Sequence, residues 1–170
     1  MGSMFNQCSA LTSLDLSSFV PSKLTTMFYM FNNCYNLTTL ILSNFDTSSV
    51  TTMSSMFYSC SSLTSLDVSS FNTEGVVNMN SMFMECWSLA TIDLNNLNIS
   101  SVTNIANMFQ NCNALKDLYI ENFDFSSVTT YGLMFNGISG NTFTIHISSE
   151  EQKNFITTNY GLANVTFSGI

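Results

Sequence analysis

Basic residues are scarce in this chain of 170 residues. It contains three lysines, no arginine and eleven acidic residues, and its net charge at pH 7 is −8. Nucleic acids and anionic membrane surfaces are bound through clusters of Lys and Arg. We therefore expect no nucleic-acid partner and no anionic membrane surface as a partner.

The sequence also lacks the residue patterns that most enzymes and membrane proteins require. His146 is the only histidine, which leaves little room for His-based catalysis or a His-rich metal site, and no Gly-rich phosphate loop is present. We therefore expect no enzymatic activity, no cofactor and no metal site. No apolar run approaches the roughly 18–20 residues of a membrane span, so we expect no membrane insertion. Residues 1–30 contain no basic segment followed by an apolar one, the pattern of a secretory signal.

Charged residues make up 8 % of the chain, and Ser, Thr and Asn take their place. An average soluble domain has about 25 % charged residues. Hydrophobic residues make up 45 %, which is typical of a folded protein and too high for a disordered one. The length suits one compact domain or one short repeat array.

An internal repeat of about 26 residues dominates the sequence, and a period of roughly 20–50 residues is typical of solenoids and related arrays. The Met-Phe pair recurs without insertion at Met4-Phe5, Met30-Phe31, Met56-Phe57, Met82-Phe83, Met108-Phe109 and Met134-Phe135. The cysteines keep the same step, at Cys8, Cys34, Cys60, Cys86 and Cys112. Several other positions, occupied by Leu, Ile, Val or Phe, recur at the same step and form columns of equivalent residues. Each unit therefore offers the same set of interior side chains. Because one unit cannot bury enough apolar surface to fold alone, stacked units must share a core.

Each unit contains two hydrophobic periods, which predict an α/β solenoid of stacked coils. The stretch 63–68 ends in the alternation of a short strand, and these strands should pair into a parallel sheet. The stretch 50–60 has apolar residues three or four apart, which predicts a short helix or 3₁₀ segment. Between them, Asp46 and its equivalents Asn72, Asn98 and Asp124 should form Asx turns.

The two ends of the chain differ from the central repeats. We expect residues 1–138 to form six repeats, of which the first is truncated and the sixth degenerate, and we interpret 139–170 as a C-terminal strand–helix–strand cap. In this cap Phe143, Ile145 and Ile147 alternate like a strand shifted by one residue. Ser148 with Glu151 fits a capping box before a helix that contains Phe155 and Ile156, and 165–167 forms a last strand. Met1 falls in the middle of a coil, so we expect the chain to be the C-terminal piece of a longer array.

The repeat resembles the unit of BspA-like leucine-rich-repeat surface proteins. The resemblance lies in the stretch from Met56-Phe57 through Cys60, Leu63, Leu66 and Val68 to Phe71, and in Phe45-Asp46-Thr47-Ser48-Ser49-Val50. It covers residues 1–138. It implies a right-handed leucine-rich-repeat-like coil and a secreted or surface-anchored parent protein that adheres to host matrix proteins, cells or surfaces. Extracellular or cell-surface localisation is therefore what the resemblance implies.

The cysteine column has two interpretations. Neighbouring coils would bring Cα atoms within disulfide range, but the number of cysteines is odd and the spacing contains no Cys-x-x-Cys element typical of zinc sites. We favour a column of small buried thiols that fill each turn. The regular Met and Phe columns are likewise interpreted as core.

The outward positions of the predicted strands are the candidate ligand-binding surface, because solenoids commonly bind through the exposed face of the stacked sheet. The candidate residues are Asp15, Ile41, Asp67, Asp93, Asp117, Tyr119 and Glu121. Asp67 and Asp93 should be neighbours with like charges, which admits a Ca²⁺ ion as an alternative ligand, although no Ca²⁺ loop motif is present. Tyr119, Trp87 and Tyr35 are candidates for sugar stacking or hot spots. Three Asn-x-Ser/Thr sequons, at Asn36, Asn98 and Asn164, are expected by chance in such a composition.

The leading functional prediction is a non-enzymatic module that binds a protein or a glycan through the exposed sheet. The first alternative is a passive spacer that holds another domain away from a cell surface. The second is self-association, because an uncapped first coil exposes a sheet edge that invites end-to-end pairing. Variation along the outward column from Asp15 to Tyr119 favours binding over a spacer.

Overall fold

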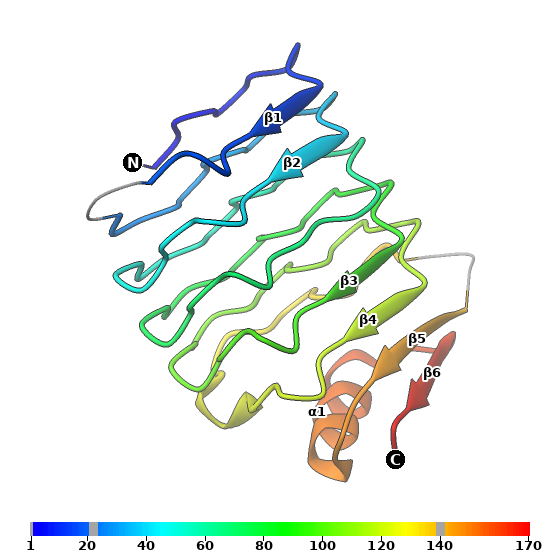
Figure 1. Cartoon of the computed structure of the whole chain (residues 1–170). Coiled ribbons are helices and arrows are strands. Elements are labelled where there is room, and N and C mark those ends of the chain that lie inside the picture. Colours follow the sequence, from blue (N-terminus) through cyan, green and yellow to red (C-terminus); the bar gives the residue numbers. More distant parts are fainter. Residues whose placement is uncertain (1, 21–23, 139–141) are drawn as a thin grey trace.

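The structure, a computed structural model, describes residues 2–20, 24–138 and 142–170. The chain winds into coils stacked one upon the next, with the first coil at one end and α1 (Glu150–Tyr160) and β6 (Val165–Ser168) at the other (Figure 1). The predicted solenoid is therefore confirmed. Met1 and the expected start of the cap at residue 139 lie outside the described residues. No helix among the described residues is both long and apolar enough to cross a membrane.

One side of the coil carries short parallel strands. Besides β6 they are β1 (Ser13–Asp15), β2 (Thr39–Ile41), β3 (Thr91–Asp93), β4 (Asp117–Tyr119) and β5 (Phe143–His146). Within each repeat strand the central residue faces the core and its neighbours face outward, as the alternation predicts. The step from β4 to β5 pairs Tyr119 with His146, one residue more than the step that pairs Asp93 with Tyr119. The predicted one-residue shift at the cap is therefore confirmed.

The third coil interrupts the row of strands. Strand pairing gives a two-stranded sheet of β1 and β2 and a four-stranded sheet in the order β3-β4-β5-β6. The strand predicted to end at Val68 does not form: residues 66–68 make no strand ladder with the coils on either side. Asp67 and Asp93 are consecutive in the outward column, and like charges side by side disfavour close strand pairing.

The stretch 50–60 is not helical, and the predicted helix or 3₁₀ segment in this part of each coil is wrong. Overlapping hydrogen-bonded turns replace it: the N–H of Met56 donates to the carbonyl of Met53 at 3.2 Å, that of Tyr58 to the carbonyl of Ser55 at 3.3 Å, and that of Cys60 to the carbonyl of Phe57 at 3.0 Å. Intervening N–H groups donate to the next coil, as from Ser55 to the carbonyl of Asn80 at 2.9 Å. A helix would use these donors internally. Successive four-residue turns share its apolar spacing, which misled the sequence-based prediction.

Residues in the left-handed conformation make these inter-coil hydrogen bonds possible, which form a second ladder besides that of the strands. Among the described residues, the non-glycine residues with positive φ fall at two repeat positions: Ser3, Tyr29, Ser55, Ser81, Asn107 and Leu133 at one, and Gln7, Asn33, Ser59, Glu85 and Asn111 at the other. Each such residue costs roughly 1–2 kcal/mol of local strain. The inter-coil hydrogen bonds offset that cost, because the N–H of each left-handed residue can then donate to the next coil, as from Ser55 to Asn80 and from Ser59 to Met84.

The predicted Asx turns are confirmed, and each follows the strand segment of its coil. The backbone N–H of Ser48 donates to Asp46 Oδ1 at 3.0 Å, and that of Ser126 donates to Asp124 Oδ1 at 2.9 Å. Asp124 thereby caps η1 (Phe125–Ser127), the one 3₁₀ helix among the described residues.

The core contains ordered columns of identical side chains. The Phe rings of successive coils stack almost parallel, with centroids of Phe57 and Phe83 5.6 Å apart and an interplanar angle of 8°. The cysteines are free, and four of them are buried. Each buried thiol donates to a Phe carbonyl of the preceding coil, as from Cys60 Sγ to the Phe31 oxygen at 3.2 Å. The interpretation of the cysteine column as buried thiols is confirmed.

The cap closes the last coil with α1 and β6. The N-cap is Ser149, and its capping-box partner is Gln152, one residue later than the predicted pair Ser148 and Glu151. The buried Gln152 Nε2 donates to the carbonyls of Ile120, Glu121 and Phe123 at 2.9–3.0 Å. Its Oε1 accepts from the N–H groups of Ser148 and Ser149. One side chain therefore joins the helix to the end of the repeat array.

Candidate binding face of the stacked strands

The aspartates of the outward column are exposed, and each ends its strand or strand-like segment with a local turn. Asp15, Asp67 and Asp93 accept a hydrogen bond through Oδ1 from the backbone N–H two residues later, at 2.8–2.9 Å. Hydrogen bonds from the Ser69 hydroxyl and backbone N–H hold the pKa of Asp67 below its usual value. The same arrangement with Ser17 lowers the pKa of Asp15. The first role of these carboxylates is thus to form a turn, which leaves their second oxygens available to a ligand.

Asp67 and Asp93 meet at the interrupted part of the sheet. They line a shallow hollow of about 550 Å³ together with Leu66, Ser69, Asn95 and Asn96. Both residues therefore border one hollow, although the strand pairing that was expected to bring them side by side is absent. The hollow offers acidic and amide oxygens around one apolar side chain.

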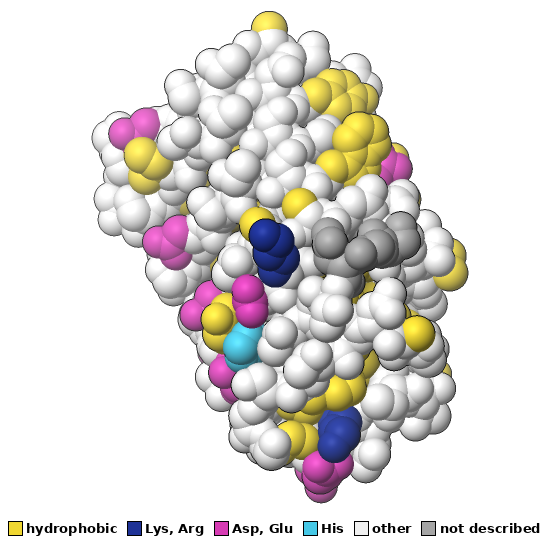
Figure 2. Space-filling view, turned by 90° about the vertical axis from the view of Figure 1, so that its right-hand side faces the viewer, with side chains coloured by type: hydrophobic (Ala, Val, Ile, Leu, Met, Phe, Trp, Pro, Cys, Tyr) yellow, Lys and Arg dark blue, Asp and Glu magenta, His cyan; other side chains and the backbone are white. Residues whose placement is uncertain are grey.

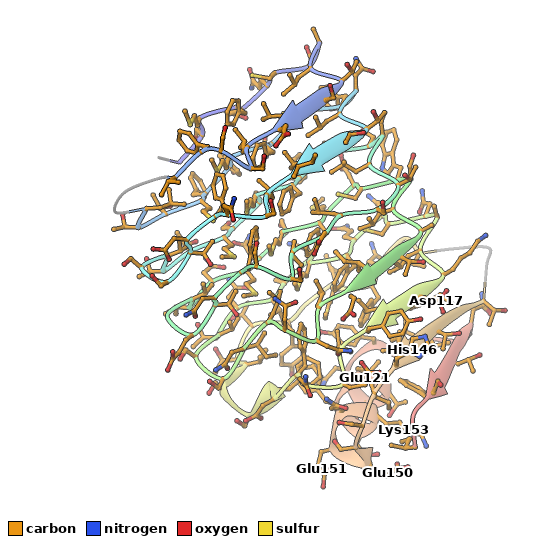
Figure 3. The ribbon with its side chains drawn as sticks, in the orientation of Figure 1. Asp117, Glu121, His146, Glu150, Glu151 and Lys153 are labelled. Atoms are coloured by element: carbon orange, nitrogen blue, oxygen red, sulfur yellow. The ribbon has the colours of Figure 1, made fainter. Side chains whose placement is uncertain are left out.

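A compact cluster of three side chains lies on the outward face of β4 and β5. His146 Nε2 is 3.1 Å from Asp117 Oδ1, and a proton on Nε2 must lie between them for this contact to be a hydrogen bond. The His146 ring stacks on Tyr119, with centroids 3.9 Å apart and an interplanar angle of 7°. The side chains stay accessible, at 39 % for Asp117 and 20 % for His146. Asp117 and His146 lie close together in Figure 3, and acidic side chains lie beside the histidine in Figure 2.

Sequence reasoning missed His146 as a member of this face. The signal for it was present, since the one-residue shift of the cap strand places position 146 beside position 119. The prediction did bring together Asp117, Tyr119 and Glu121, which follow one another along the same coil. All three are partly buried, because β5 and the cap lie beside them.

The other predicted residues are spread along the solenoid. Ile41 is exposed on β2, at 41 %, two coils away from Asp93. Tyr35 and Trp87 are 47 % and 54 % exposed, but they lie in the segment before the strands. The structure therefore does not bring them together with Tyr119 into one aromatic platform.

The outward face offers no preformed metal cage. Within residues 2–20, 24–138 and 142–170, no group of three or more His, Cys, Asp or Glu side chains is placed to hold a metal ion. The carboxylates and amides of this face suit contacts with hydroxyl groups or with cationic side chains, because a single carboxylate or amide can bind either of these groups.

Comparisons with known proteins identify a family and a similar solved structure. The sequence matches the family described as "Mycoplasma protein of unknown function, DUF285" over residues 1–118 and again over 36–150. No curated protein matches the chain at a significant level. Among solved structures, a leucine-rich repeat protein from Bacteroides ovatus ATCC 8483 is similar at 18 % identity and a TM-score of 0.39, covering 86 % of this chain and 36 % of that one. The chain thus spans about a third of the length of that protein.

Proposed function

The chain belongs to the DUF285 family, whose description assigns no activity, and from the geometry of its outward face we propose that it is a non-enzymatic binding module. It recognises a protein or a glycan through the exposed face of the strands from Asp15 to His146. The parent protein is proposed to display this module at the cell surface, as the resemblance of the repeat to surface proteins implies.

The observation that carries the proposal is a contrast between positions of one coil. The buried positions repeat with little change: the cysteines and the Met-Phe pairs recur at a constant step, and four of the five cysteines and most of the Met-Phe pairs are fully buried. The outward position, in contrast, changes from Asp15 to Ile41, Asp67, Asp93 and Tyr119. Packing does not require this variety, because the outward side chains contact little of the core. A surface that recognises a particular partner does require it.

The chemistry of the face narrows the class of partner. Carboxylates, Asn side chains and a Tyr–His stack bind hydroxyl groups and cationic side chains. An anionic partner would meet a chain of net charge −8 and is disfavoured. We expect the partner to present sugar hydroxyls or Lys and Arg side chains.

An array of matrix proteins and glycans, probed with the folded chain, tests the proposal. Every hit is repeated with D67N/D93N, which removes two charges from the face while Asn keeps the turn hydrogen bond at Oδ1. The matched control is D46N/E74Q, since Asp46 and Glu74 are exposed outside the strand face. We expect at least one hit that the face variant weakens and the control preserves.

Two results would count against a binding module. One is the absence of any hit with folded protein, which favours the spacer. The other is a set of hits that both variants weaken equally, because that dependence reflects net charge alone. Light scattering on the unmodified chain tests the alternative of end-to-end self-association, and a mass independent of concentration excludes it.

A further inference from the structure

A groove separates the end of the repeat array from the beginning of α1. It has a volume of about 570 Å³, and its walls are the segment that follows β4 and the first turn of α1. Figure 3 shows Glu121 on one wall and Glu151 on the other. It adjoins the strand face at Glu121, and the inference drawn from it does not rest on the proposed function of that face.

The floor of the groove is aromatic. Phe125 and Phe155 stack with ring centroids 4.3 Å apart and an interplanar angle of 5°. Phe125 is 9 % exposed, whereas Phe155 is only partly buried. An apolar side chain that covered the exposed part of this pair would remove apolar surface from water, which stabilises a complex by about 25 cal/mol per Å².

The rim of the groove is acidic. Glu121, Asp124 and Glu151 line it, and none of its described lining residues is Lys, Arg or His. Glu121 Oε2 is buried and has no hydrogen-bond partner among the described residues, which is an unfavourable state for a carboxylate oxygen. The backbone N–H of Ser126 lowers the pKa of Asp124, so this carboxylate is ionised at neutral pH. A cationic group in the groove would compensate these charges.

The two walls are fixed relative to each other before any ligand arrives. Gln152 bonds the carbonyls of Ile120, Glu121 and Phe123 on one wall and the N–H groups of Ser148 and Ser149 on the other. A preformed groove does not have to be ordered on binding, which lowers the entropic cost of association.

We propose that this groove binds a segment of a partner protein in which an apolar side chain is flanked by Lys or Arg. The apolar side chain lies on Phe125 and Phe155, and the flanking cations pair with Glu121, Asp124 and Glu151. Charge complementarity selects this occupant. A second copy of the chain is a poor candidate, because it has three lysines and no arginine, and anionic lipid headgroups would be repelled.

The test is a titration of the ¹⁵N-labelled chain, followed by NMR, with two acetylated peptides of sequence GSKFKSG and GSEFESG. The basic peptide should shift the amides of Ser126, Ser148 and Phe155, and the acidic peptide should leave them unchanged at the same concentration. The variant D124N/E151Q should raise the Kd of the basic peptide about fivefold at low ionic strength, because it removes two exposed ion pairs. The replacement Asn keeps the turn hydrogen bond that Asp124 accepts, so the groove is retained.

The matched control is D46N/E74Q. Asp46 occupies in the second coil the repeat position that Asp124 occupies in the fifth, and it accepts the same hydrogen bond, from Ser48. This control should change the Kd less than twofold. Equal weakening by both double variants, shifts centred away from the groove, or equal binding of the acidic peptide would overturn the proposal. The variant D67N/D93N should leave peptide binding unchanged, so failure of the groove and failure of the strand face are distinguishable.

Discussion

Replacement of Gln152 by Ala should separate the cap from the repeat array. Gln152 is 5 % exposed and takes part in five hydrogen-bond contacts: its two amide N–H groups are shared among three carbonyls, and its oxygen accepts from two N–H groups. Ala at this position keeps the helix propensity of α1 and removes all five bonds. The expected effect is therefore specific to the junction between α1 and the last coil.

The magnitude follows from what becomes of each former partner. The Ile120 carbonyl still accepts from the N–H of Phe123, and the Glu121 carbonyl still accepts from Ser148 Oγ. The Phe123 carbonyl has no other partner among the described residues, and a buried unsatisfied group costs about 1–3 kcal/mol. Ser148 and Ser149 are accessible enough for water to replace the lost acceptor. With loss of the capping box, worth about 1 kcal/mol, the total is about 2–4 kcal/mol.

Urea unfolding and native-state hydrogen exchange of α1 measure this loss. The amide of Ile156 should lose protection first, because local opening of the cap does not require the repeats to unfold. Q152E should be at least as destabilising as Q152A, since it cannot donate to the three carbonyls. The neighbouring variant K153A removes a partly exposed side chain and should cost less than about 0.5 kcal/mol. If Q152A changes the free energy of unfolding by no more than such a surface substitution, about 0.5 kcal/mol, the reasoning is refuted.

Three further predictions concern the repeats. F83A should cost about 3–5 kcal/mol in urea unfolding, because Phe83 is fully buried between Phe57 and Phe109; a loss below about 2 kcal/mol would contradict a tightly packed ring column. L133G should stabilise the chain by about 0.5–1 kcal/mol, because Leu133 has a φ of +60° and is 57 % exposed, and lower stability would show that its side chain packs usefully. Burial raises the pKa of Cys34 to about 11 and that of Cys112 to about 12, from 9.0; since the folded state retains these protons, their contribution to stability is complete below pH 9 and is lost as the pH rises through 11 for Cys34 and through 12 for Cys112. Each thiol adds a slope of about 1.4 kcal/mol per pH unit in that window, which urea titrations from pH 8 to 11 should record; the variant C34A/C112A should lower the slope by about half, because burial also raises the pKa of Cys60 and that of Cys86.

Most of the apolar columns could be predicted, although the buried position of Ile99 and Phe125 was missed, but the backbone between the columns could not. Met53, Met56 and Cys60 are spaced as on a helix, and the sequence indicated correctly that they face the core. Whether the intervening N–H groups bond within the segment or to the next coil depends on the presence of that coil. The hydrogen bonds between coils therefore stabilise turns in which Ser55 and Ser59 adopt the left-handed conformation, although residues other than glycine disfavour it.

The candidate sites follow the same division. The positions of Asp67, Asp93, Asp117 and Tyr119 on the outward face could be predicted, because the constant repeat period fixes which side of each coil they occupy. The shifted register of the cap strand could have placed His146 on this face beside Tyr119, but its side-chain contact with Asp117, which pairs with Thr144, could not be predicted. Neither could the groove lined by Asp124 and Glu151, whose walls are distant in the chain and meet only when α1 packs on the last coil.

The sequence by itself determined the solenoid, the order of its interior columns and the strand–helix–strand cap, because a strict repeat presents the same apolar pattern to each neighbour and has one way to bury it. Only the tertiary structure decided how the backbone hydrogen bonds are distributed and which polar side chains meet at the coil edges. Those choices depend on donors and acceptors a whole coil apart in the chain, such as Ser55 with Asn80 and Gln152 with Ile120, and no local pattern records which of them will pair.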